Sequence, residues 1–358
     1  MKSQSVALPT QRSSGPSLIK KNAVPILFAV LCALGVVVAE IDPLFLINEI
    51  ITRLARNSFL VLALLIPVSA GLGLNFAIVI GAMAGQMAII TITHFKIKGL
   101  LGFSLAMLGC IPLAAVMGYL AGMVMNRAKG REMITSMILG FFANGLYQLV
   151  FLFLVGTVIP MKNRSMMLPG GVGLRNTIDL YPTAKVLDKL WRIDIAGIRI
   201  PMATLILVAL LCIGLHFLMR TRLGQEMRAV GQDMNIAAVA GIDVNRTRII
   251  AMVFSTVLAA WGQLIFLQNI STLNTYNSHE QVGTFAIAAL LVGGATARKA
   301  SIWQALVGLL LFHTLFVVSP LAGQAIVGIP QIGEYFRVFI AYGVIGVALA
   351  LHAWQSRA

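Results

Sequence analysis

The residues of this sequence that could do chemistry are a few amides, an imidazole and aromatic rings that stand inside long apolar runs. A polar side chain in hydrocarbon has no water to bind, so it needs a partner in the protein or a ligand. Asn75 and Gln86 lie 11 positions apart, about three helical turns, which predicts a shared face. Asn144 and Gln148 have the i,i+4 spacing that brings side chains together on a helix.

These groups are suited to binding a polar solute, and the aromatic rings could stack on a ring compound. The predicted solute path is lined by Asn75, Phe76, Gln86, Asn144, Gln148, Gln263, Phe285 and His313. The structural alternative for each residue is a hydrogen bond between helices or aromatic packing.

Signals of catalysis are missing from the sequence. It contains no G-x-x-x-x-G-K-[ST] phosphate-binding motif, and Cys32, Cys110 and Cys212 show no paired metal spacing. The carboxylates map to the ends of apolar runs or to loops, which argues against a proton relay. We therefore expect no catalytic residue, no metal and no cofactor on this chain, so that any energy from ATP must be supplied by another subunit.

Composition sets the class of protein. Hydrophobic residues make up 59% and charged residues 11% of the 358 residues, and the mean hydropathy is +0.91. A soluble domain carries about 25% charged residues, so the sequence predicts a polytopic protein of the lipid bilayer. The net charge is +15, but no basic domain with interleaved stacking residues occurs, and nucleic acid is not an expected partner.

Apolar runs long enough to cross a bilayer recur along the whole chain, and they predict an all-α membrane protein with about ten transmembrane helices. The expected spans are Ala23–Ala39, Asn57–Ala70, Asn75–Thr93, Leu100–Met125, Met133–Ile159, Pro201–Met219, Ile249–Gln268, Val282–Ala297, Ser301–Ser319 and Phe336–Trp354. The second and third of these could instead form a re-entrant hairpin. Gly81-x-x-x-Gly85 and Gly118-x-x-x-Gly122 predict close helix contacts.

One transmembrane domain, 23–354, is expected between a mobile polar tail, 1–22, and a short C-terminal segment, 355–358. Lys and Arg gather in short loops on one side of the membrane, about 15 against about 5, which places both termini and the basic loops in the cytoplasm. The long segment 160–200 then lies outside the cell membrane, with one short helix near Thr183–Trp191. A cleaved signal peptide at Val37-Val38-Ala39 is an alternative to the first span.

A polar, basic and helix-prone loop, 220–248, interrupts the apolar pattern between two spans. It holds the string GQEMRAVGQDMNIAAVAGI from Gly224 to Ile242, with a short helix expected at Met234–Ala240 and small residues that would let another surface approach closely.

In this string the sequence resembles the permease subunits of bacterial ABC importers of the ribose, branched-chain amino acid and nucleoside type. The resemblance implies a loop that inserts into a cleft of an ABC ATPase and transmits its closure to the spans. The residues implied in this coupling are Gly224, Arg228, Asp233, Asn235, Ala237, Ala238 and Gly241. It also implies a bacterial inner-membrane location, ATP and Mg on the ATPase, a second permease subunit, identical or paralogous, and an extracytoplasmic solute-binding protein.

The substrate class stays open at this point. Many sugar permeases of the family carry G-G-I-D-L-S-V-G where this chain has GLGLNFAIVIG at Gly71–Gly81, so that Asn75 stands for an acidic-polar pair. A monosaccharide is the favoured solute, and a nucleoside or other polar ring compound is the alternative within the family. A stand-alone secondary carrier or channel, or a scaffold without solute flux, are the competing classes. The match of Asn75–Ile78 to Thr284–Ile287 also suggests an inverted repeat.

Overall fold

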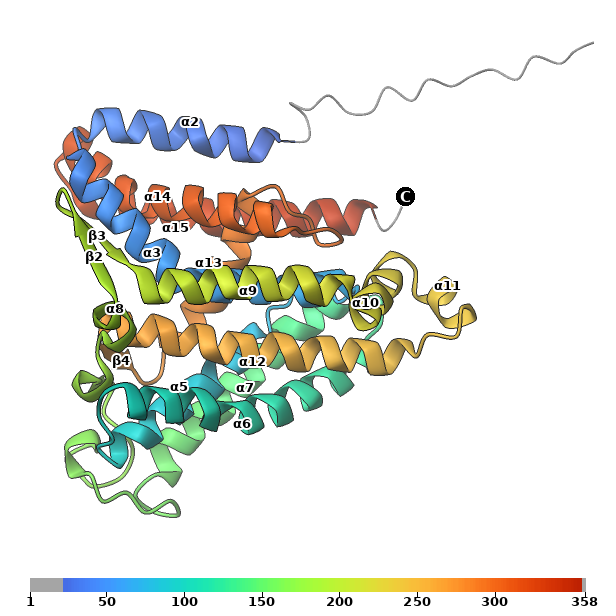
Figure 1. The fold of residues 1–358 in the computed structure, drawn as a ribbon, viewed down its shortest axis with the longest axis horizontal. Helices are drawn as coiled ribbons and strands as arrows, with labels where there is room; N and C mark the ends of the chain where they lie inside the picture. Colours follow the sequence, from blue (N-terminus) through green and yellow to red (C-terminus); the bar gives the residue numbers. More distant parts are fainter. Residues whose placement is uncertain (1–21, 356–358) are drawn as a thin grey trace, which may run out of the picture.

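The chain folds into a bundle of apolar helices that run side by side (Figure 1). The computed structural model describes residues 22–355; the predicted tail, apart from Asn22, and residues 356–358 lie outside this range. The helices of the bundle are α2 (Ala23–Val38), α3 (Pro43–Ala63), α4 (Leu65–Ser69), α5 (Ile78–His94), α6 (Gly99–Arg127), α7 (Glu132–Leu149) with a π-turn (Val150–Leu154), α9 (Met202–Arg220), α12 (Val244–Ile270), α13 (Ser278–Val292), α14 (Ile302–Val327) and α15 (Pro330–Gln355).

Six of the described helices are long and apolar enough to cross a membrane, and two more apolar helices, α2 and α5, are shorter. The predicted membrane protein is thus confirmed in its class. The predicted start of the second span at Asn57 is wrong, because the helix begins at Pro43. Pro43 suits a first helical position, and the Asp42 side chain accepts from the N–H groups of Leu44 and Phe45, so the helix starts well before the apolar run.

Helix α12 lies at the centre of the bundle and is packed against α3, α5 and α6. The two glycine pairs make this packing possible. A Cβ atom on Gly81 or Gly85 would lie 2.4–2.5 Å from a backbone oxygen of α12, and one on Gly118 would lie 2.8 Å from the Thr256 hydroxyl. Both predicted glycine contacts are therefore confirmed, and both are with α12.

Two prolines inside helices leave carbonyl oxygens free, and polar side chains of neighbouring helices bind them. Pro67 releases the carbonyl of Ala63, which accepts a hydrogen bond from the Ser255 hydroxyl of α12 at 2.9 Å. Pro320 releases the carbonyl of Phe316, which accepts from Arg337 of α15 at 3.2 Å. Each proline thus fastens its helix to a neighbour.

Short strands, which the all-α prediction omitted, lie at one end of the bundle (Figure 1). The strands are β1 (Thr177–Asp179), β2 (Arg192–Ile195), β3 (Ile198–Pro201) and β4 (Thr272–Asn274), paired antiparallel as β2–β3 and β1–β4. The β1–β4 pair ties segment 160–200 to the connection between α12 and α13. The predicted short helix is confirmed as α8 (Val186–Leu190), accompanied by single 3-10 turns at Arg164–Met166 and Tyr181–Thr183. We call this the hairpin end.

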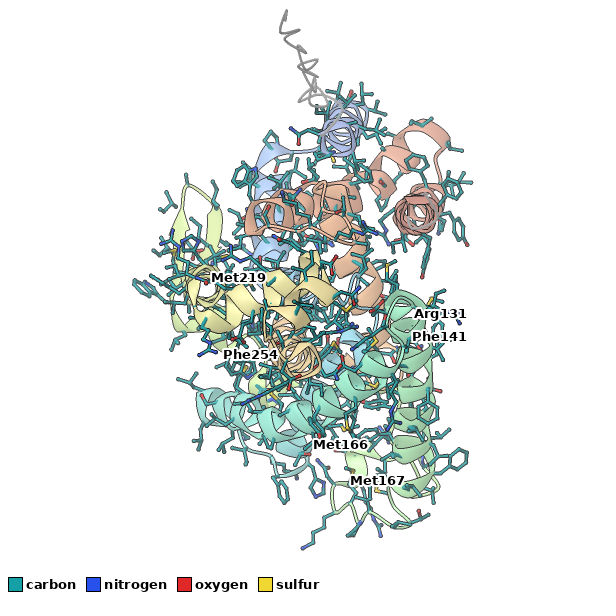
Figure 2. All side chains as sticks on the ribbon, turned by 90° about the vertical axis from the view of Figure 1, so that its right-hand side faces the viewer. Arg131, Phe141, Met166, Met167, Met219 and Phe254 are labelled. Atoms are coloured by element: carbon teal, nitrogen blue, oxygen red, sulfur yellow. The ribbon has the colours of Figure 1, made fainter. Side chains whose placement is uncertain are left out.

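The opposite end carries α10 (Arg222–Gln232) and α11 (Met234–Val239) beyond the ends of α9 and α12 (Figure 1). Figure 2 looks onto this end and shows Phe141 at the edge of the bundle, where 70% of its side chain is exposed. Large apolar side chains on the perimeter suit contact with lipid, whereas in water they would promote aggregation.

The two segments of the suggested repeat, Asn75–Ile78 and Thr284–Ile287, have different local structures. Asn75 precedes the first residue of α5, whereas Thr284 lies inside α13. For the same reason Asn75 does not share a helical face with Gln86.

Candidate functional site

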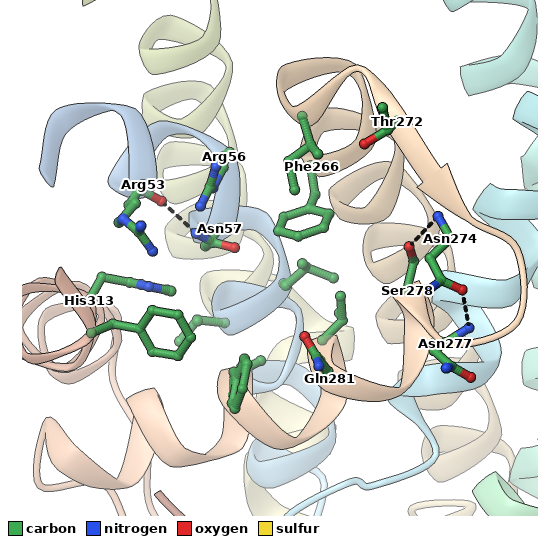
Figure 3. Close-up of a pocket in the computed structure, with 17 residues that line it drawn as sticks. Arg53, Arg56, Asn57, Phe266, Thr272, Asn274, Asn277, Ser278, Gln281 and His313 are labelled. Atoms are coloured by element: carbon green, nitrogen blue, oxygen red, sulfur yellow. Dashed lines mark hydrogen bonds between the residues drawn. The ribbon is translucent and has the colours of Figure 1, made fainter. Parts of the chain in front are cut away.

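A cavity of about 300 Å³ opens near the hairpin end between α3, the end of α12, α13 and α14 (Figure 3). Its described lining consists of Arg53, Arg56, Asn57, Leu60, Val61, Phe266, Ile270, Thr272, Asn274, Asn277, Ser278, Gln281, Val282, Phe285, Ala286, His313 and Phe316. We call it the hairpin-end cavity. An apolar wall with a few convergent polar groups is the usual make-up of a small-molecule site, and this volume is at the lower end of the usual range of about 300–1,000 Å³.

The cations of the cavity come from one face of α3, at i,i+3 spacing. Arg53 Nε lies 3.1 Å from a carboxylate oxygen of Glu49. Arg56 donates to the side-chain oxygen of Asn269 at 3.2 Å, and among the described residues no carboxylate lies within ion-pair distance of it. The described lining contains no carboxylate either, so its electrostatic character is positive.

Three phenylalanines form the apolar wall. The Phe285 ring lies 5.2 Å from Phe316, edge to face, and the guanidinium of Arg53 lies 5.4 Å from the Phe316 centroid. The Arg56 guanidinium lies 5.5 Å from the centroid of Phe266. Such cation–π contacts hold a guanidinium beside an apolar wall without neutralising its charge.

Amides and hydroxyls face the cationic side across the cavity. Figure 3 shows Asn274, Asn277, Ser278 and Gln281 on the side opposite Arg53. Asn274 Oδ1 accepts from the backbone N–H groups that follow it, and Ser278 Oγ accepts from the N–H of Asn274. The turn between β4 and α13 is therefore held by its own side chains, which positions this polar wall.

Two predicted path residues, Phe285 and His313, line this cavity. His313 is 6% exposed, and its Nδ1 is buried without a hydrogen-bond partner among the described residues. Its ring lies 6.0 Å from Phe316. Of the predicted path residues, these two therefore lie at a cavity that could hold a solute.

Three other predicted residues, Gln86, Asn144 and Gln148, meet in a separate cluster. His279 at the start of α13 joins them: its Nδ1 lies 2.7 Å from Gln86 Oε1 and its Nε2 lies 2.8 Å from Asn144 Oδ1. Asn144 also donates to Glu280 and accepts from Gln148. The cluster joins α5, α7 and α13 through hydrogen bonds. This agrees with the alternative interpretation of these residues, in which they hold helices together and do not bind a solute.

Asn75, Phe76 and Gln263 lie apart from both groups. Asn75 is fully buried, and its Oδ1 accepts from the N–H of Ala77. The backbone N–H of Phe76 donates to the Ser136 hydroxyl of α7 at 3.1 Å. Gln263 is fully buried in α12, and neither atom of its amide has a partner among the described residues. None of the three lines the hairpin-end cavity.

The sequence interpretation missed Arg53, Arg56 and His279. The first two were placed before the second span because charged residues normally end an apolar run. The Asp42-Pro43 helix start, ten residues before Arg53, was the signal that could have put both arginines inside a helix. His279 gave no such signal, because its partners Gln86 and Asn144 are more than 100 positions away.

The second candidate site is the 220–248 loop at the other end of the bundle. Helix α11 occupies the expected place, capped by Asp233, whose carboxylate accepts from the N–H groups of Asn235 and Ile236 at 2.7 and 3.0 Å. Asn235 and Ala238 are exposed, and Gly241 follows the helix with φ of +83°. Arg228 is exposed on α10.

Two residues of the predicted coupling set face inward. Ala237 is 2% exposed and packs in a small cluster with Val230 and Val244. Gly224 is buried, and a Cβ there would lie 2.1 Å from the carbonyl oxygen of Leu218. In this structure both residues pack inside the loop and are not on its exposed surface. The large exposed apolar residues of α11 are Ile236 and Val239, 69% and 91% exposed, which the prediction did not include.

The loop is fastened to the bundle at two points. Gly231 of α10 lies against the Ser69–Gly71 backbone, where a Cβ would lie 2.2 Å from the Ser69 oxygen. Arg248 of α12 is fully buried, donates to Glu132 of α7 at 2.7 Å and contacts the sulfur of Met234 in α11 at 2.8 Å. A hollow of about 1490 Å³ lies beside these contacts.

Comparisons with known proteins give a family and several relatives. The chain is 26% identical over 157 residues to the xylose transport system permease protein XylH of Haemophilus influenzae, covering 43% of this chain and 38% of the relative. It is 24% identical over 239 residues to the fructose import permease protein FruG of Bifidobacterium longum, covering 66% and 63%. It is 28% identical over 171 residues to the D-allose transport system permease protein AlsC of Escherichia coli, covering 46% and 48%.

The chain thus spans about half the length of these curated relatives, between 38% and 63%. No solved structure matches it. The apolar helices and the permease relatives identify a multi-pass protein of the inner membrane. A family model described as the permease component of the branched-chain amino acid transport system matches residues 46–349, which is most of the sequence, and the chain belongs to this family.

Proposed function

We propose that this chain is the translocation subunit of an ATP-driven ABC importer for a monosaccharide. The observation that carries the proposal is α11, a short helix at the end of the bundle whose exposed side chains include Ile236 and Val239. An exposed apolar pair on a polar loop, in a protein of this family, is suited to insertion into a groove of another subunit. We assign that groove to the ATPase, because the chain has no phosphate-binding motif of its own.

The contacts below α11 provide the mechanical route. Movement of α11 is passed to α7 and α12 through Met234, Arg248 and Glu132. Movement of α10 is passed to the α4–α5 connection through the contact of Gly231 with Gly71, whose close backbones leave no space for a side chain. The α4–α5 connection follows directly on α3 and α4, and α3 lines the hairpin-end cavity, so the continuous segment of α3 and α4 joins the two ends of the bundle.

The proposed topology has ten spans with both termini and the 220–248 loop in the cytoplasm, and the hairpin end outside. In Figure 1 the C-terminal end of α15 lies toward the same end of the bundle as α10 and α11, which supports this arrangement. The hairpin-end cavity would then open toward an external solute-binding protein. A second permease subunit, identical or paralogous, and two ATPase subunits complete the proposed assembly, with ATP and Mg on the ATPase.

The sugar assignment rests on the three relatives, whose names give xylose, fructose and allose. The hairpin-end cavity supports it, because amides and hydroxyls face aromatic rings there, as a polar ring compound requires. The experiment is uptake by cells with and without the gene, using D-xylose, D-fructose, D-allose, D-glucose and D-glucuronate. We expect uptake of at least one solute that stops when ATP is depleted and persists when the proton gradient is collapsed. The reverse energy dependence would contradict an ABC importer, and no uptake of any solute would contradict the sugar assignment.

A further inference from the structure

Two arginines and no carboxylate line the hairpin-end cavity in the part of the chain that the structure describes, although a neutral sugar requires no positive charge for binding. Arg53 and Arg56 stand inside the 27-residue apolar helix segment Pro43–Ser69. An arginine within a membrane span is costly and normally marks a partner or a ligand. The arrangement of carboxylates around the two guanidiniums shows which of them has a partner.

Arg53 is accounted for by Glu49, one turn before it. Arg56 is not, because its described hydrogen-bond acceptor is the neutral amide of Asn269. Asn269 in turn donates to Asp188, whose carboxylate oxygens accept from Asn269 at 2.7 Å, Thr204 at 3.0 Å and Gln268 at 3.3 Å. In addition, Arg56 Nε is buried without a partner among the described residues.

The surroundings of Arg56 favour an anion over water as its missing partner. The ring of Phe266 covers one side of the guanidinium, and the described lining of the cavity contributes no carboxylate. Guanidinium groups bind carboxylates and phosphates through paired N–H donors. The amide and hydroxyl side chains across the cavity are left to bind the hydroxyl groups of the same solute.

We propose that the hairpin-end cavity binds a monosaccharide derivative that carries a negative charge, a carboxylate or a phosphate, with Arg56 as the residue that recognises the charge. This inference rests on the proposed function, and it narrows the solute from a neutral monosaccharide to an acidic one. His313 and Gln281 contribute the neutral polar contacts, and Phe266 and Phe285 provide apolar faces for the sugar ring.

The test is equilibrium binding of labelled solutes to the purified full-length permease in nanodiscs. D-glucuronate and D-glucose form a matched pair, with the same number of carbons, the same pyranose ring and a difference of one charge, and D-glucose 6-phosphate and inorganic phosphate complete the panel. We expect D-glucuronate or D-glucose 6-phosphate to bind about tenfold or more tightly than D-glucose, the scale of one charge-assisted hydrogen bond. The preferred anion identifies the group, and its affinity should fall as NaCl rises.

Arg56→Gln should reduce the preference to about threefold or less, since glutamine keeps a donor but loses the charge. The control is Arg192→Gln on β2, where an exposed arginine is paired with Asp194 at the same end of the molecule. Equal binding of D-glucuronate, D-glucose 6-phosphate and D-glucose, or a preference that survives Arg56→Gln, would overturn the inference. Binding of inorganic phosphate alone would also overturn it, because the site would then not recognise a sugar.

The result separates this inference from the proposed function. ATP-dependent uptake of a neutral sugar with no preference for the anion refutes the acidic solute and leaves the importer intact. Energy-independent uptake of D-glucuronate would refute the importer while leaving the binding preference in place.

Discussion

The buried pair of Arg248 and Glu132 should respond to substitution in a strongly non-additive way. Arg248 is completely buried and the Glu132 side chain is 11% exposed, with 2.7 Å between Nη2 and Oε1. Loss of one partner from a buried pair costs about 3–5 kcal/mol, because the other charge stays buried. For Glu132→Gln we expect about 3 kcal/mol, the lower limit, because the site has some access to water.

Arg248→Met should cost less, about 1–3 kcal/mol, because Glu132 can turn toward water once its partner is lost. The double variant Glu132→Gln/Arg248→Met buries no unpaired charge and should cost less than the sum of the two single changes, by about 2 kcal/mol or more. The free energy of unfolding is measured in mixed micelles for all four proteins, and hydrogen exchange of the α11 backbone reports the local effect. Additive losses within about 0.5 kcal/mol would refute the reasoning.

Two further predictions concern the packing around α12. Gly81→Val should prevent α5 from packing closely against α12, because the first side-chain carbon already falls 2.4 Å from the Thr256 carbonyl oxygen. The temperature of thermal unfolding and the yield of inserted protein should both fall. Ser255→Ala should leave the Ala63 carbonyl without its donor and cost about 0.6–2 kcal/mol, the range for hydrogen bonds between helices in membranes; unfolding in mixed micelles measures this loss.

Matched controls exist for both changes. Gly109→Val places the same side chain in α6, where nothing lies within 4 Å of the added carbon, so it should leave the temperature of thermal unfolding unchanged. Ser104→Ala removes an exposed hydroxyl of the same helix and should be neutral. A Gly81→Val protein as stable as Gly109→Val would show that α5 and α12 are not in close contact. Equal unfolding free energies for Ser255→Ala and Ser104→Ala would remove the role assigned to Ser255.

Much of the helical framework could be read from the sequence because it is written in local features. Apolar length predicted the helices, the i,i+4 spacing predicted the contact of Asn144 with Gln148, and small residues at Gly81 and Gly85 predicted a close helix contact. The string from Gly224 to Ile242 predicted the position of α11. In each case the decisive residues are within a few turns of one another.

The composition of the hairpin-end cavity was not predictable in the same way. Its lining comes from α3, α12, α13, α14 and the β4 segment before α13, and a hydropathy pattern does not say which elements are neighbours. Arg56 sits beside Asn269, 213 positions away in the chain. A charged residue also interrupts an apolar run, so the rule that locates spans placed both arginines outside the membrane helix. The sequence therefore pointed to Phe285 and His313 of this lining but not to the two arginines.

The role of α11 is the central claim, and co-purification tests it most directly. Tagged permease is extracted from its native membrane in mild detergent as wild type, Val239→Asp and Val172→Asp, and the bound proteins are identified. Val239 is 91% exposed on α11, and Val172 is 40% exposed in segment 160–200 at the opposite end. We expect an ATPase to be recovered with wild type and Val172→Asp and lost with Val239→Asp. Recovery of the ATPase with all three proteins, or with none, would contradict the claim.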